Sequence, residues 1–246
     1  MKTSVLKKGS RMASLILIAI LFVSATLMAC ENAVRGSGVV VREVRETPSF
    51  TGVSVSSAIK LVVTQDEAYE VVVSADDNLL PYILTEVSGN SLRIGVEPFT
   101  SLRGYKEITV YVTAPLFEKI SCSGAAEVEG TGLLSQESLQ IKCSGAGNVN
   151  LQVESSYLEV DGSGASDIRL EGTTRSLQAT VSGASDMKSF GLECLMAEVG
   201  LSGASDLQIT VSENVTGKAS GASSLNVRGG ASVDVRTSGA SSVASR

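Results

Sequence analysis

The sequence contains no histidine, and this absence narrows the chemistry that the protein can perform. Histidine is the base of Ser-His-Asp and Cys-His nucleophile systems, the commonest metal ligand, and the usual side chain that titrates near neutral pH. The sequence therefore excludes those catalytic systems and histidine metal sites. Carboxylate chemistry remains open.

Aromatic side chains are also scarce. The chain has 5 Phe, 5 Tyr and no Trp, and after Phe117 only Tyr157 and Phe190 remain. A core with so few rings must be packed from Val, Ile, Leu and Ala in thin, regular layers. Such layers are typical of solenoids, in which each repeat packs on its neighbours.

Basic residues are few once the N-terminus is set aside. Residues 1–29 carry four Lys and Arg and no acidic residue, so the remaining chain has 16 basic and 26 acidic side chains, a net charge of −10. Nucleic acids and anionic lipid surfaces both select basic protein surfaces. The net charge therefore argues against nucleic acid or anionic lipid as a partner.

No apolar run is long enough to cross a bilayer, although the N-terminus holds a short one. Four basic residues precede the apolar run at residues 15–23, which leads to LMAC with Cys30 last. This is the pattern of an export signal over residues 1–29. LMAC resembles the lipobox of bacterial lipoproteins, which implies cleavage before Cys30, acylation of Cys30 by a chain such as palmitate, and a lipid anchor at the outer membrane. The alternative is an ordinary secretory signal that happens to meet a cysteine.

The tripeptide Ser-Gly-Ala recurs seven times at nearly one period. Its serine stands at positions 123, 144, 163, 182, 202, 220 and 238, with steps of 18 to 21 residues. Self-similarity at about 20 residues is the signature of a solenoid. Mostly apolar residues alternate with polar ones on both sides of each tripeptide, which predicts two strands per repeat with one buried face. The glycine allows a bend and the serines can bond unpaired backbone groups, so Ser-Gly-Ala is expected to form a corner.

These features predict an all-β fold, a right-handed parallel β-helix of about 18–21 residues per coil. The left-handed β-helix depends on a strict hexapeptide rhythm, which the variable steps do not fit. Acyltransferases built on left-handed β-helices also employ a histidine base, which this chain lacks.

The chain before the repeats is rich in strand patterns but less regular. Residues 49–61 align with residues 116–128, which places Phe50 on Phe117 and Ser57 on Gly124. We therefore expect irregular early coils or a cap over residues 38–117, after a lipidated N-terminus and linker at 30–37. The regular repeat then occupies residues 118–246, with no obvious polar cap at its end.

Several motifs in order resemble one known family. They are GSGVVVREVRETPSFTGVSVSSAIKLVVTQ at 36–65, DDNLLPYILTEVSGNSLRI at 76–94, and the Ser-Gly-Ala-Ser-Asp repeats behind a lipobox. Together they resemble the auto-transporter adhesin family, also called the head GIN domain family, of bacterial envelope proteins. The resemblance covers residues 33–246 and implies a pectin-lyase-like β-helix without the catalytic residues of the lyase, with a role in cell adhesion. The family defines no functional residues that could be carried over.

Three repeats place an aspartate after the corner, at Asp167, Asp186 and Asp206. Stacking in register would form a ladder with neighbours about 5 Å apart, the separation of the two carboxylates of a retaining glycosidase. Three interpretations stay open for this tentative binding ladder: a solvated row that caps turns, a weak cation site, or a catalytic pair. No motif with calcium-binding spacing is present, so no metal or other cofactor is predicted.

Two of the remaining cysteines, Cys122 and Cys143, immediately precede consecutive Ser-Gly-Ala tripeptides and should stack. A disulfide between them is one interpretation in an oxidising envelope, and two small buried thiols are the other.

The sequence as a whole predicts a non-catalytic envelope lipoprotein, an adhesin-like module that presents a β-helix face to a glycan or a protein. Its open last coil suggests a homo-oligomer, such as a trimer, through unpaired strand edges. The alternative is a polysaccharide-active β-helix enzyme that uses the stacked carboxylates. That enzyme would need a groove lined by rings and basic residues, for which Arg93, Arg103 and Tyr105 form the one candidate cluster.

Overall fold

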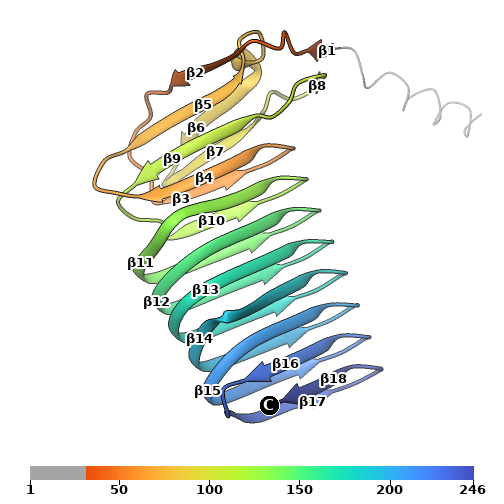
Figure 1. The fold of residues 1–246 in the computed structure, drawn as a ribbon. Helices are drawn as coiled ribbons and strands as arrows, with labels where there is room; N and C mark the ends of the chain where they lie inside the picture. Colours follow the sequence, from red (N-terminus) through yellow and green to blue (C-terminus); the bar gives the residue numbers. More distant parts are fainter. Residues whose placement is uncertain (1–31) are drawn as a thin grey trace, which may run out of the picture.

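The computed structural model describes residues 32–246, which form a long stack of β-coils (Figure 1). The export signal and Cys30 lie outside the described residues. Within residues 32–246, no helix is long and apolar enough to cross a membrane. The stacked coils pair in parallel, so the predicted parallel β-helix is confirmed.

The regular part of the stack consists of coils that each turn once at a narrow corner and once at a rounded bend (Figure 1). Each of the long strands runs along one face, passes round the bend and returns along the other face. Its strands are β10 (Lys119–Cys122), β11 (Glu127–Cys143), β12 (Asn148–Gly162), β13 (Asp167–Val181), β14 (Asp186–Leu201), β15 (Asp206–Ala219), β16 (Ser224–Arg228), β17 (Ser232–Thr237) and β18 (Ser242–Ser245).

Alternation of apolar and polar residues sets which side chains point inward. The first aliphatic residue after each corner stacks on its counterpart in the next coil, and in five successive coils this residue is at most 1% exposed: Val128, Val149, Ile168, Met187 and Leu207. Full burial of such a side chain contributes roughly 1.5–3 kcal/mol. The core therefore consists of stacked aliphatic side chains, as the small number of aromatic residues predicted.

The Ser-Gly-Ala tripeptides form the narrow corners, as the sequence predicted. All seven corner glycines have a positive φ of 72° to 80°. The amide of the alanine in one corner donates to the carbonyl oxygen of the glycine in the preceding corner, for example Ala184 to Gly164 at 2.7 Å. A Cβ atom on Gly183 would lie 2.6 Å from that carbonyl oxygen. Glycine is therefore required at the corner both by its φ and by the close approach of the next coil.

Ser57 forms a further corner, stacked before the seven Ser-Gly-Ala corners. The sequence alignment placed Ser57 on Gly124. Ser57 has a φ of 70°, and its carbonyl oxygen accepts from the amide of Ala125 at 3.1 Å. Strand β3 (Gly52–Val55) pairs with β10, and β4 (Lys60–Gln65) pairs with β11, both in parallel. Residues 52–65 are therefore a coil of the same stack.

The rest of the N-terminal part stacks beyond this coil and out of chain order. Strand β7 (Ser91–Val96) pairs in parallel with β3, and β9 (Thr109–Ala114) pairs in parallel with β4. Antiparallel strands cover these two: β5 (Glu70–Asp76) pairs with β9, and β6 (Ile83–Ser88) with β7. The 3-10 helix η1 (Leu80–Tyr82) connects β5 to β6. The N-terminal part thus combines an early coil with an antiparallel cap.

The outermost layer of this end consists of β1 (Asn32–Arg35), β2 (Val40–Val44) and β8 (Thr100–Arg103). Strand β1 pairs in parallel with β8, and β2 pairs antiparallel with β5. Residues 32–35, which the sequence placed in a linker, are therefore a strand. One apolar core runs from Phe50 to Val227, so the N-terminal part and the repeats share it.

Substitution of Gly183 by alanine should destabilise the stack. A left-handed alanine and its contact with the neighbouring carbonyl together cost about 1–3 kcal/mol. The matched control is Gly132→Ala, because Gly132 has open space around its Cβ position and no positive φ. Denaturant unfolding should show the loss for Gly183→Ala and a change within about 0.5 kcal/mol for the control. Equal stability of the two variants would contradict the role given to the corner.

Candidate functional site

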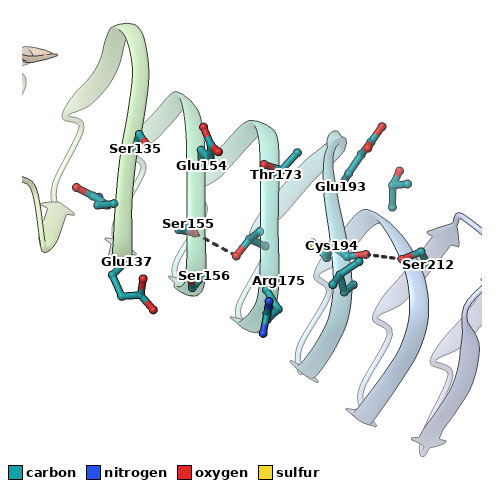
Figure 2. A pocket seen from close by; sticks show the side chains of 14 residues that line it. Ser135, Glu137, Glu154, Ser155, Ser156, Thr173, Arg175, Glu193, Cys194 and Ser212 are labelled. Carbon is teal, nitrogen blue, oxygen red and sulfur yellow. Dashed lines mark hydrogen bonds between the residues drawn. The ribbon is translucent and has the colours of Figure 1, made fainter.

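A groove of about 580 Å³ crosses the coils at the rounded bends of β11 to β15. Its walls come from the same short segment of each successive coil, so it runs across the strands (Figure 2). The lining residues are Ser135, Gln136, Glu137, Glu154, Ser155, Ser156, Thr173, Thr174, Arg175, Glu193, Cys194, Leu195, Thr210 and Ser212.

One row of this groove is an in-register ladder that alternates hydroxyls and carboxylates. Its members, in stacking order, are Ser135, Glu154, Thr173, Glu193 and Thr210. Adjacent strands lie about 4.8 Å apart, so the backbones that bear Glu154 and Glu193 are about 10 Å apart, with Thr173 between them. Glu154, Thr173 and Glu193 are all exposed.

The next row forms the floor of the groove and is held by hydrogen bonds. Thr174 and Cys194 are register partners and are 4% and 3% exposed. The Ser155 hydroxyl donates to Thr174 Oγ1 at 3.1 Å, and the Ser212 hydroxyl donates to the Cys194 carbonyl at 3.4 Å (Figure 2). The floor is therefore fixed before any ligand arrives.

The groove carries more negative than positive charge. Its lining holds three carboxylates, Glu137, Glu154 and Glu193, against the single guanidinium of Arg175. Within residues 32–246 none of these four makes an ion pair. The carboxylates of the ladder alternate with hydroxyls, so they lack the close spacing of a retaining glycosidase pair. The groove offers hydrogen-bond donors and acceptors along the solenoid axis, and its lining includes no ring.

The structure brings Asp167, Asp186 and Asp206 together in register, as the sequence predicted, but beside the corners and outside the groove lining. Basic residues two positions further along the same strands pair with two of them. Arg169 lies 3.0 Å from Asp167, and Lys188 lies 2.8 Å from Asp186. Among the described residues, no group of three or more Cys, Asp or Glu side chains is arranged to hold a metal ion.

The residues Arg93, Arg103 and Tyr105, proposed as a cluster, do not line one common groove. Arg93 lines a second hollow of about 470 Å³ with Glu86 and Lys142, whereas Arg103 and Tyr105 do not line that hollow. Tyr105 is partly buried against the core.

The stacked cysteines Cys122 and Cys143 are register partners, and the structure holds them as buried, unbridged thiols. The neighbouring Cys143 thiol and burial raise the pKa of Cys122. The neighbouring Cys122 thiol lowers the pKa of Cys143. Burial alone raises the pKa of Cys194 to about 12.

The stacked coils and the open groove at their bends define a β-solenoid with an extended surface across several coils. The family model described as "Putative auto-transporter adhesin, head GIN domain" matches residues 49–231. The chain belongs to this family. The description of the family favours an adhesin-like module at the cell envelope or surface over an enzyme.

Solved structures with the same fold include proteins of Bacteroides and Parabacteroides. A putative adhesin from Bacteroides fragilis has a TM-score of 0.81 at 20% identity, covering 87% of this chain and 100% of the other. A putative lipid binding protein from Parabacteroides distasonis has a TM-score of 0.73 at 17% identity with the same coverage. A putative adhesin from P. distasonis has a TM-score of 0.66 at 19% identity, again with the same coverage. A search of curated proteins found no match. At these identities the similarity shows the fold alone.

Sequence reasoning missed the groove because the coils differ in length at the bend. The strand pairing shifts register between Glu129 and Leu133, between Ile168 and Gly172, and between Ser189 and Glu193. Counting from each Ser-Gly-Ala therefore does not align Ser135, Glu154 and Glu193. The available signal was the concentration of Ser, Thr and Glu midway between corners.

The three buried cysteines should resist alkylation in the folded protein. A thiolate is the reactive form, and burial together with the raised pKa of Cys122 and Cys194 leaves little of it. Iodoacetamide at mildly alkaline pH should label Cys122, Cys143 and Cys194 only after unfolding. Intact mass without reductant should then show three labels on these residues; a count of one would reveal a Cys122–Cys143 disulfide instead.

Proposed function

We propose that the protein is a lipid-anchored envelope adhesin that binds an extended glycan in the groove across β11 to β15. The observation that carries this proposal is the ladder of Ser135, Glu154, Thr173, Glu193 and Thr210, which repeats polar groups at the coil spacing along the axis. A glycan presents hydroxyls repeatedly along one direction. A ladder of acceptors and hydroxyls on a rigid backbone matches such a ligand.

The chemistry of the lining favours neutral or amine-bearing sugars over acidic ones. Carboxylates accept hydrogen bonds from sugar hydroxyls, and bonds to charged groups contribute about 1.5–3 kcal/mol each. An acidic sugar would meet the excess of carboxylates over Arg175 and be repelled. The lining has no ring on which a sugar could stack, so affinity depends on several hydrogen bonds made at once.

The anchor in this proposal is the acylated Cys30 at the outer membrane. Cys30 precedes β1 by two residues, and β1 belongs to the outermost layer of the N-terminal end. An anchor there would hold this end at the membrane and leave the repeats available to a ligand. The groove would then lie between the anchor and the last coil.

A glycan-array assay on residues 31–246 tests the binding proposal. The double variant Glu154→Ala/Glu193→Ala should weaken binding by about a hundredfold or more, since each of the two lost charged hydrogen bonds costs about 1.5–3 kcal/mol. The control Glu198→Ala/Asp234→Ala removes two exposed carboxylates from outside the groove lining and should bind like the parent.

The same array separates the other interpretations. Binding that needs Ca²⁺ and disappears with Asp186→Asn would assign the function to the aspartate ladder instead. Cleavage of a bound glycan would establish the enzyme alternative. Absence of binding to every glycan would overturn the glycan proposal and direct the search to an envelope protein or to a second copy of the chain in a homo-oligomer.

A further inference from the structure

Exposed apolar side chains gather at the N-terminal end of the solenoid, although the end of a solenoid normally needs a polar surface for solubility. Ten large hydrophobic side chains are exposed among the described residues, and five of them lie in β2, directly before β2, or in the turn before β8. They are Val39, Val40, Val41, Val44 and Phe99. Strands β1 and β2 run across this end of the molecule (Figure 1).

Phe99 is the most exposed of these side chains, and the fold gives no reason for it. It is 90% exposed, and its φ of 63° lies in the left-handed region. A bulky residue held there costs about 1–2 kcal/mol, and a ring in water recovers none of this by burial. A polar residue or glycine would suit folding better at this position.

Strand pairing fixes where Phe99 lies relative to the start of β1. Asn32 in β1 pairs with Thr100 in β8, and Phe99 immediately precedes Thr100. Only Glu31 separates Cys30 from Asn32. Phe99 therefore lies beside the end of β1 that follows Cys30 by two residues in the sequence.

The other end of this strand pair carries two adjacent arginines. Arg35 and Arg103 are register partners, and both are exposed. Neither makes an ion pair within residues 32–246. Two arginines at register positions, without a carboxylate partner, are suited to an anion, in contrast to the acidic remainder of the chain.

The outer layer is fastened to the cap and so forms a rigid surface. The Ser37 amide donates to Asn78 Oδ1 at 2.9 Å, and the Gly38 amide donates to the buried Asp76 carboxylate at 2.9 Å. The Asn78 side-chain amide in turn donates to the Arg35 carbonyl at 2.8 Å. These bonds hold the connection between β1 and β2 in place.

We infer that this end is a membrane-contact surface, on which Phe99 and the β2 valines enter the bilayer interface while Arg35 and Arg103 meet lipid phosphates. The inference rests on the proposed acylation of Cys30, which brings the bilayer to this end. Aromatic rings and arginines are favoured at the interface between headgroups and acyl chains. The net charge of −10 argued against lipid for the chain as a whole, but this contact is mainly apolar and confined to one end.

The absence of tryptophan from the chain makes a direct test possible. The variant Phe99→Trp introduces a single reporter at the proposed contact. Tyr157→Trp is the matched control, since it places a single reporter on an exposed ring site of β12, in the middle of the stack. Both full-length lipoproteins are reconstituted on vesicles of phosphatidylethanolamine, phosphatidylglycerol and phosphatidylcholine brominated near the headgroup end of its acyl chains.

The emission of Phe99→Trp should shift to shorter wavelength on the vesicles, and bromine should quench it severalfold more than the emission of Tyr157→Trp. Equal, weak quenching of both variants, with Cys30 shown to be acylated by intact mass, would overturn this inference and leave the anchor standing. An intact mass without an acyl chain would overturn the anchor. If the protein carries no acyl chain and bromine also fails to quench Phe99→Trp, the proposed membrane contact is overturned as well.

Discussion

The structure depends on one repeated backbone contact, the hydrogen bond from the alanine amide of one corner to the glycine carbonyl of the preceding corner. Its length is 2.7 Å at five successive corners, from Ala146 to Ala222. At this approach a Cβ atom on the glycine would overlap the carbonyl of its neighbour. The corner therefore fixes the distance and the register between coils, and the aliphatic columns inside can stack without large side chains.

A fixed corner leaves the opposite side of each coil free to vary. The steps between Ser-Gly-Ala copies range from 18 to 21 residues, and the register shifts in β11, β13 and β14 lie on the way to the rounded bend. The groove is found at these bends. The Ser-Gly-Ala corners thus specify the fold, whereas the bends on the opposite side of the coils form the groove.

The same separation explains what could be predicted from the sequence. The corners, the alignment of Ser57 with Gly124 and the register of Asp167, Asp186 and Asp206 follow from a repeated local motif, and all three are found in the structure. The groove could not be predicted, because bulges displace its residues from any constant offset. The stacking of β7 and β9 beyond β3 and β4 could not be predicted either, since alternation specifies a buried face but not the partner of a strand.

The place of the groove along the stack also determines how a mechanical load would pass through the molecule. Each coil is bonded only to its neighbours, so a force applied at β18 would peel β18, β17 and β16 away one after another. A ligand held across β11 to β15 would apply its force to several coils at once, each paired with a neighbour on both sides. The last coils, with their half-exposed valines, would then lie outside the load path between such a ligand and an anchor at the N-terminal end.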